Sequence, residues 1–157
     1  MKSLMKNLFK DILKGKVVIV GIGNLLRGDD GFGPKLIEKI KNSAQVVCLD
    51  AGTAPENYLG KIIKENPDTI LIVDAVHLDL SPGEYDILKP SDIVKSGFTT
   101  HDISPRMFLE YLEKETKADI YLLGVQPENV SFGNEMSENV KKTLKEITVL
   151  IKEVEHA

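Results

Sequence analysis

The sequence predicts an α/β protein in which a twisted, mostly parallel sheet lies between two layers of helices, a three-layer αβα sandwich. Two observations indicate this fold class. Short runs rich in Val, Ile and Leu alternate along the chain with longer segments whose apolar residues recur at helical spacing. The short runs carry few polar residues, which is typical of parallel strands covered on both faces. Strands that alternate with helices build such a sheet because each parallel connection needs a crossover.

The expected elements follow one another in a regular order. An amphipathic helix opens the chain, with an apolar face made of Leu4, Met5, Leu8, Phe9, Ile12 and Leu13. Buried strands are expected at four runs of aliphatic residues, 16–23, 45–50, 69–76 and 119–125. Later helices are expected within 33–42, 51–66, 102–116 and 134–154. The segment 83–90 is shorter and more polar, and we interpret it as an antiparallel edge strand.

The chain has the size and composition of one globular domain. It has 157 residues, of which 42% are hydrophobic and 28% charged, so it can bury a core without disulfides. We expect residues 1–15 to form an N-terminal amphipathic helix extension and residues 16–157 to form a single domain. The apolar face of the extension is expected to pack on that domain, and the alternative is that it mediates self-association.

Charge and cysteine content exclude several classes of protein. The net charge of −4 gives no general attraction for nucleic acid or an anionic membrane. Lys6, Lys10 and Asp11 interrupt the first apolar stretch, so it is not a signal peptide, and no later apolar run is long enough to span a bilayer. The single cysteine, Cys48, falls within an apolar strand, where an inert thiol is expected. We therefore expect a cytoplasmic protein.

Acidic and polar side chains follow the expected strands, at the edge where open parallel sheets bind ligands. Asp29 and Asp30 come after the first strand, Asp74 ends the third, and His101 lies in a later loop. One acid of the adjacent pair can cap the following helix, which leaves the other to face the rim. A carboxylate at the end of a buried strand needs a donor or a cation. Two carboxylates and an imidazole on three loops make an open metal site, suited to nickel, zinc or iron(II) alike.

A dinucleotide site is the competing interpretation of the first loop. Gly21 and Gly23 begin like the G-x-G-x-x-G fingerprint, but Leu26 stands at the third glycine position. Asp29 and Asp30 would also place negative charge where a pyrophosphate needs positive potential. We therefore interpret the glycines as permitting a tight loop with close backbone approach.

Five short segments occur in the order of one known family. They are GIGNLLRGDDGFG, DAGT, ILIVDAV, a TTH loop and GVQP, and together they span about residues 17–146. This set resembles the hydrogenase maturation proteases, endopeptidases that finish the large subunit of nickel-iron hydrogenases. The resemblance implies a three-layer α/β fold and removal of the C-terminal extension from a large-subunit precursor. The GVQP segment, with Gln126 and Pro127, resembles the branch that acts on energy-converting and related hydrogenases.

The resemblance also implies the site residues. The first-loop acid corresponds to Asp30, where some relatives carry glutamate, and the other two ligands correspond to Asp74 and His101. The metal implied is nickel that arrives with the precursor, while zinc or another divalent cation could occupy the isolated protein.

Two interpretations stay open for how water is activated and two for whether the protein hydrolyses its partner. Water could be activated by the metal or by Asp30 and Asp74 sharing one proton, as in the aspartic peptidases among which the family is often catalogued. The paired D-T/S-G signature of that class is absent, since DAGT at 50–53 occurs once. The same three ligands would also serve a maturation chaperone that binds nickel or the precursor without hydrolysing it.

Overall fold

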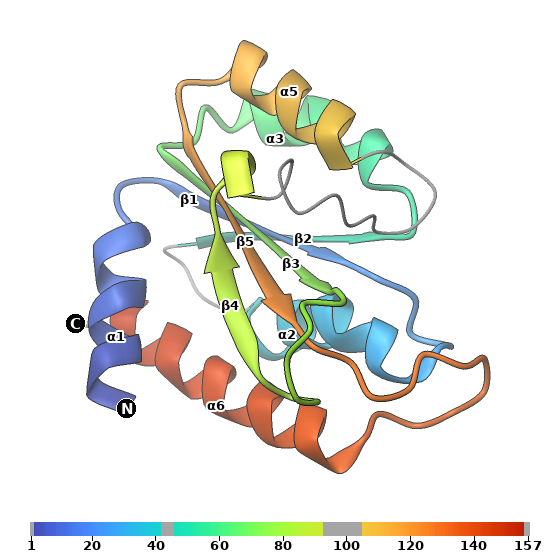
Figure 1. Ribbon diagram of the computed structural model, residues 1–157. Coiled ribbons are helices and arrows are strands. Elements are labelled where there is room, and N and C mark those ends of the chain that lie inside the picture. Colours follow the sequence, from blue (N-terminus) through green and yellow to red (C-terminus); the bar gives the residue numbers. More distant parts are fainter. Residues whose placement is uncertain (1, 42–45, 93–104, 156–157) are drawn as a thin grey trace.

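A five-stranded sheet forms the centre of the molecule, with strand order β2-β1-β3-β5-β4 (Figure 1). The computed structural model describes residues 2–41, 46–92 and 105–155. The strands are β1 (Val17–Ile22), β2 (Val46–Gly52), β3 (Thr69–Ala75), β4 (Tyr85–Leu88) and β5 (Asp119–Val125). All neighbouring pairs are parallel except β4 and β5, so the antiparallel edge strand is confirmed. The α/β fold class predicted from the sequence is confirmed as well.

Helices cover both faces of the sheet, as Figure 1 shows. One layer contains α1 (Lys2–Ile12), α2 (Phe32–Ile40) and α6 (Glu138–Glu155), and the other contains α3 (Leu59–Lys64) and α5 (Pro105–Glu115). Alternate residues of β1 point to opposite layers. Val17 and Ile19 pack in the core on the side of α1, α2 and α6, whereas Val18 and Val20 pack in the core on the side of α3 and α5. This double burial explains the uninterrupted apolar run. No helix in the described ranges is both long and apolar enough to cross a membrane.

The N-terminal helix α1 packs against α6. Phe9 and Ile12 are buried in the core that α6 shares, and Lys6 Nζ lies 3.6 Å from a carboxylate oxygen of Glu153. Leu4 and Leu8 stay exposed. Packing on the body of the protein therefore accounts for the inner part of the predicted apolar face, and self-association through the outer part stays a prediction.

The last helix begins later than the sequence suggested. Its expected span was 134–154, whereas α6 begins at Glu138. The backbone N–H and the hydroxyl of Ser137 both donate to the carboxylate of Asp29, at 2.7 and 2.9 Å. Segment 134–137 is therefore part of a loop fixed by a distant acid, and the expected start of this helix was wrong by four residues.

Candidate functional site

The site lies where the strand order reverses. From β1 the chain crosses to β2 on one side and returns to β3 on the other, so the connections leave the carboxyl ends of β1 and β3 in opposite directions. Such a switch point opens a crevice in which α/β proteins bind ligands. The 3₁₀ helix η1 (Gly28–Gly31) follows β1 and contacts β3. Asp30 lies in η1 and Asp74 lies near the end of β3, so both carboxylates belong to this one edge.

Gly33 shows how closely α2 approaches the two strands. A Cβ built at Gly33 would lie 2.6 Å from the carbonyl oxygen of Val73 and would also collide with the carbonyl oxygen of Ile22. Only a glycine lets the first turn of α2 sit against the residue that precedes Asp74. The N-terminal end of the α2 dipole therefore lies at the edge that carries the two carboxylates, where it favours negative charge.

Asp29 is a structural residue. Its side chain is fully buried and accepts four hydrogen bonds from the loop between β5 and α6. The donors are the backbone N–H groups of Glu128 (2.8 Å), Asn129 (3.0 Å) and Ser137 (2.7 Å) and the hydroxyl of Ser137 (2.9 Å). One carboxylate thus ties the loop after β1 to a loop about a hundred residues away.

Asp29 and Asp30 have different roles, but neither of them caps a helix as expected. Helix capping was the structural role foreseen for one of them, yet neither the N-cap of η1 nor Gly31, the N-cap of α2, forms a side-chain capping bond. Asp29 binds the other loop instead. The expectation of a helix cap was therefore wrong, because a tertiary partner took the carboxylate.

Asp30 is half-buried and is held against the end of β1. Its Oδ2 accepts a hydrogen bond of 3.0 Å from the backbone N–H of Asn24. Gly23 has a φ of +149°, and a Cβ there would collide with the carbonyl oxygen of Asp30. This positive φ and close approach confirm the prediction that the loop glycines permit a tight turn. The loop thereby fixes where the Asp30 carboxylate lies relative to β1.

Asp74 is 1% exposed and lies on the central strand β3, between β1 and β5. His101, the third predicted ligand, lies outside the described residues, and so does Asp102. Within residues 2–41, 46–92 and 105–155 no group of three His, Cys, Asp or Glu side chains is arranged to hold a metal ion. The three-ligand site therefore stays a prediction, of which the structure positions two members.

Gln126 organises the loop that follows β3. Its side chain is buried, and its Oε1 accepts hydrogen bonds from the backbone N–H groups of Leu78 (2.6 Å) and Leu80 (3.4 Å). Its Nε2 lies 3.3 Å from His77 Nδ1 and donates to the carbonyl of Pro127 at 3.3 Å. The amide of Gln126 thus fixes the segment that leaves Asp74.

These tertiary roles were not predicted. The position of Gln126 directly after a buried strand, at the edge that carries Asp74, was the signal available in the sequence. Ser137 offered no signal, because 108 residues separate it from the Asp29 carboxylate that it binds.

Cys48 fits the prediction of an inert thiol. Burial, and next the nearby negative charge of Glu155, raise the pKa of its thiol from 9.0 to about 11. The reactive thiolate is therefore scarce at neutral pH. Cys48 also pairs with Ile19 in the middle of β2, away from the strand ends that carry Asp30 and Asp74.

Comparison with known proteins decides the family. The family model described as hydrogenase maturation protease matches residues 33–154. The chain belongs to the hydrogenase maturation protease family. The hydrogenase 3 maturation protease of Escherichia coli K12 is 36% identical over 133 residues, which cover 83% of this chain and 85% of that protein. A putative hydrogenase maturation protease of Methanocaldococcus jannaschii is 36% identical over 150 residues, covering 87% and 88%.

Solved structures of maturation proteases share the whole architecture. The crystal structure of the [NiFe] hydrogenase maturation protease HycI from Thermococcus kodakarensis has a TM-score of 0.88 and 34% identity, covering 96% of this chain and 99% of that one. The crystal structure of a hydrogenase 3 maturation protease has a TM-score of 0.78 and 33% identity, and the match covers 85% of this chain and 87% of that one. The members of this family are peptidases. The family and the fold predicted from the sequence are therefore both confirmed by these comparisons.

Proposed function

We propose that this protein is the endopeptidase that removes the C-terminal extension from a nickel-loaded large-subunit precursor of a [NiFe] hydrogenase. One observation carries the proposal: in a maturation protease, Asp30 and Asp74 lie at a single switch-point edge. The loops after β1 and β3 build that edge, and ligands of open α/β sheets bind at such edges. The cytoplasm is the compartment expected for this activity.

The nickel belongs to the substrate in this proposal. Asp30, Asp74 and His101 take up coordination positions on the nickel that the precursor carries, and an empty precursor forms no such contacts. Two carboxylates and an imidazole suit nickel(II), as they suit zinc. The bound ion orients the adjacent peptide bond and polarises its carbonyl or the attacking water. The carboxylates hold the ion, and the leaving amine departs with the C-terminal extension.

The test is cleavage of purified precursor, with and without nickel, followed by mass spectrometry of the released tail. We expect wild-type protein to cut the nickel-loaded form alone. Asp74→Asn and His101→Ala should each lower the rate by about 10³-fold, because both remove a ligand that positions the reacting bond. Processing at the wild-type rate by either variant would show that the site assignment is wrong.

A matched control uses the same aspartate substitution on another strand. Asp50 is an exposed aspartate near the end of β2, and its Oδ1 accepts a 3.0 Å bond from Gly52 N–H. Asp50→Asn should therefore keep the rate within about threefold, since surface substitutions have small effects. Tight precursor binding without any released tail would favour a maturation chaperone instead.

A further inference from the structure

A groove of about 480 Å³ lies beside η1, between α2 and the start of α6. Gly28 and Gly31, the two ends of η1, are among its lining residues, and η1 also carries Asp30. Its floor is apolar, formed by the buried Leu144 and the half-buried Met136. The groove therefore borders η1, the element that carries Asp30.

The rim of this groove is basic although the whole chain is acidic. Lys35 and Lys39 line one side and Lys141 the other, with Glu135 as the single acid in the lining. Lys35 and Lys39 are four residues apart on α2, where like charges repel each other. No described residue forms an ion pair with either of them, and Lys141 has only an exposed contact of 3.4 Å with Glu138. The formal net charge is −4, so this rim departs from the overall charge.

Exposed apolar side chains lie on the loop after β1 and on the loop between β5 and α6. Leu25 is 51% exposed, Leu26 is 61% exposed and Phe132 is 74% exposed. Their loops are fixed to each other, because Gly133 N–H donates to the carbonyl of Leu26 at 2.8 Å and Arg27 Nε donates to the carbonyl of Val130 at 3.1 Å. Large apolar side chains held in water on a rigid support are typical of a protein-binding surface.

We propose that this groove docks an acidic segment of the precursor, carrying apolar residues, and so presents the neighbouring peptide bond to Asp30. Charge complementarity selects the occupant. Lys35, Lys39 and Lys141 attract carboxylates, while the floor and the loop tips accept the aliphatic or aromatic side chains of the same segment. The inference rests on the proposed function for the identity of the partner, and it adds how that partner is recognised away from the metal.

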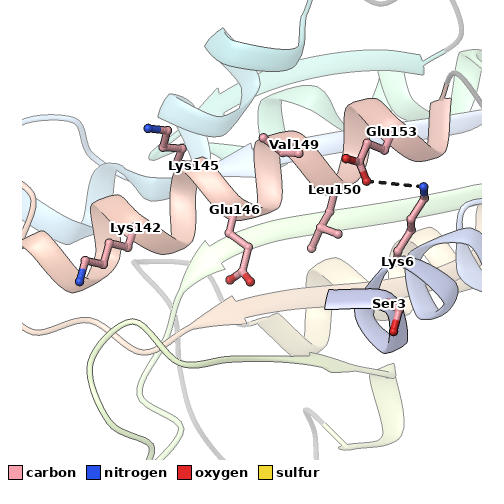
Figure 2. Close-up of a pocket in the computed structure, with 8 residues that line it drawn as sticks. All are labelled: Ser3, Lys6, Lys142, Lys145, Glu146, Val149, Leu150 and Glu153. Atoms are coloured by element: carbon pink, nitrogen blue, oxygen red, sulfur yellow. Dashed lines mark ion pairs between the residues drawn. The ribbon is translucent and has the colours of Figure 1, made fainter. Parts of the chain in front are cut away.

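A second groove on the same helical layer provides a matched control (Figure 2). It lies between α1 and α6 and is lined by residues of both charges, among them Lys142, Lys145 and Glu146. Lys6 and Glu153 already form an ion pair across it. Lys142 and Lys145 are exposed, like Lys35 and Lys39, but they do not line the groove at η1.

The experiment compares Lys35→Glu/Lys39→Glu with Lys142→Glu/Lys145→Glu. Each double variant lowers the formal net charge from −4 to −8, so any general effect of charge is the same in both. Cleavage of the nickel-loaded precursor and its binding by fluorescence anisotropy are measured at low and high salt. We expect the first pair to raise KM and Kd by about tenfold at low salt, with kcat within about twofold and the salt dependence flattened. The control pair should change each value by less than about threefold.

The outcomes separate the docking inference from the proposed function. Equal effects of the two double variants would overturn the docking groove, whereas failure of wild-type protein to cut the bound precursor would overturn only the protease assignment. Poly-L-glutamate should compete with the precursor for wild-type protein and not for Lys35→Glu/Lys39→Glu. Sedimentation showing a dimer of wild-type protein that the same variant dissociates would assign the groove to a second copy and reject our occupant. Lys35→Gln/Lys39→Gln gives an intermediate effect if charge is the cause.

Discussion

Replacing Asp29 tests the claim that one buried carboxylate joins two distant loops. Asp29→Asn keeps the size of the side chain but exchanges one acceptor oxygen for an NH₂ group. Whichever position the NH₂ group takes, it faces at least one of the four donors that the carboxylate now binds. A hydrogen bond to a charged group contributes about 1.5–3 kcal/mol, and an unsatisfied buried donor costs about 1–3 kcal/mol. Because the backbone donors belong to a loop that can relax toward water, we expect a total loss of about 3 kcal/mol.

The loss is measured by urea and thermal unfolding. For a chain of this length 3 kcal/mol corresponds to a fall in Tm of roughly 6–12 °C. Hydrogen exchange adds a local readout, since the amides of Glu128, Asn129 and Ser137 should exchange faster in Asp29→Asn. Ser137→Ala removes one of the four bonds to the charged group, so it should cost about 1.5 kcal/mol. The exposed Asp50→Asn removes the same charge and should cost under about 0.5 kcal/mol. Asp29→Asn with wild-type stability and unchanged exchange at the three amides would refute the reasoning.

Three further predictions follow from close contacts and shifted pKa values. Gly33→Ala should destabilise the fold by about 3 kcal/mol in urea unfolding, because its Cβ would collide with the carbonyl oxygen of Val73. Gly60 lies in open space on α3, so Gly60→Ala should be neutral or stabilising by up to about 1 kcal/mol. Equal effects of the two substitutions would contradict the packing of α2. Iodoacetamide at pH 8 should modify Cys48 about 100-fold more slowly in native than in unfolded protein, because its thiol pKa is about 11 instead of 9.0; equal rates would contradict that pKa. Burial, and next the charge of Glu146, raise the pKa of Tyr85 from 10.0 to about 12, so absorbance at 295 nm should show a last ionisation that Tyr85→Phe removes. The neutral phenol is favoured in the folded state, so its contribution to stability is complete below pH 10 and is lost as the pH rises through about 12; stability that does not fall over this interval would contradict the assignment.

Burial patterns explain why most of the fold could be predicted. Val17–Ile22 and Thr69–Ala75 are buried along their whole lengths, so the apolar runs Val17–Ile22 and Ile70–Val73 identified central parallel strands. The more polar Tyr85–Leu88 was interpreted as an antiparallel edge strand, and among the described strands its partner is β5. Helix boundaries were less accessible to this reasoning, because the start of α6 depends on a hydrogen bond between Ser137 and a residue of the first loop.

Part of the candidate site could also be predicted from the sequence. The rule that ligands bind at strand ends directed attention to Asp30 and Asp74, and both lie at the switch point between β1 and β3. The same rule could not distinguish Asp29 from Asp30, since both follow the strand and both carry a carboxylate. That distinction needed the position of the β5–α6 loop, which is remote in the chain and supplies all four donors to Asp29.

The sequence by itself determined the order of strands and helices, the family, and the short set of acids from which a site can be made. Periodicity and local composition carry the order of elements, because they depend on neighbours in the chain, and five short segments carry the family resemblance. Only the tertiary structure decided that Asp29 is a tether, that Gln126 fixes the loop after β3, and that Lys35 and Lys141 face each other across a groove. Each of these facts is a contact between segments far apart in the chain, and a contact of that kind depends on how the layers pack.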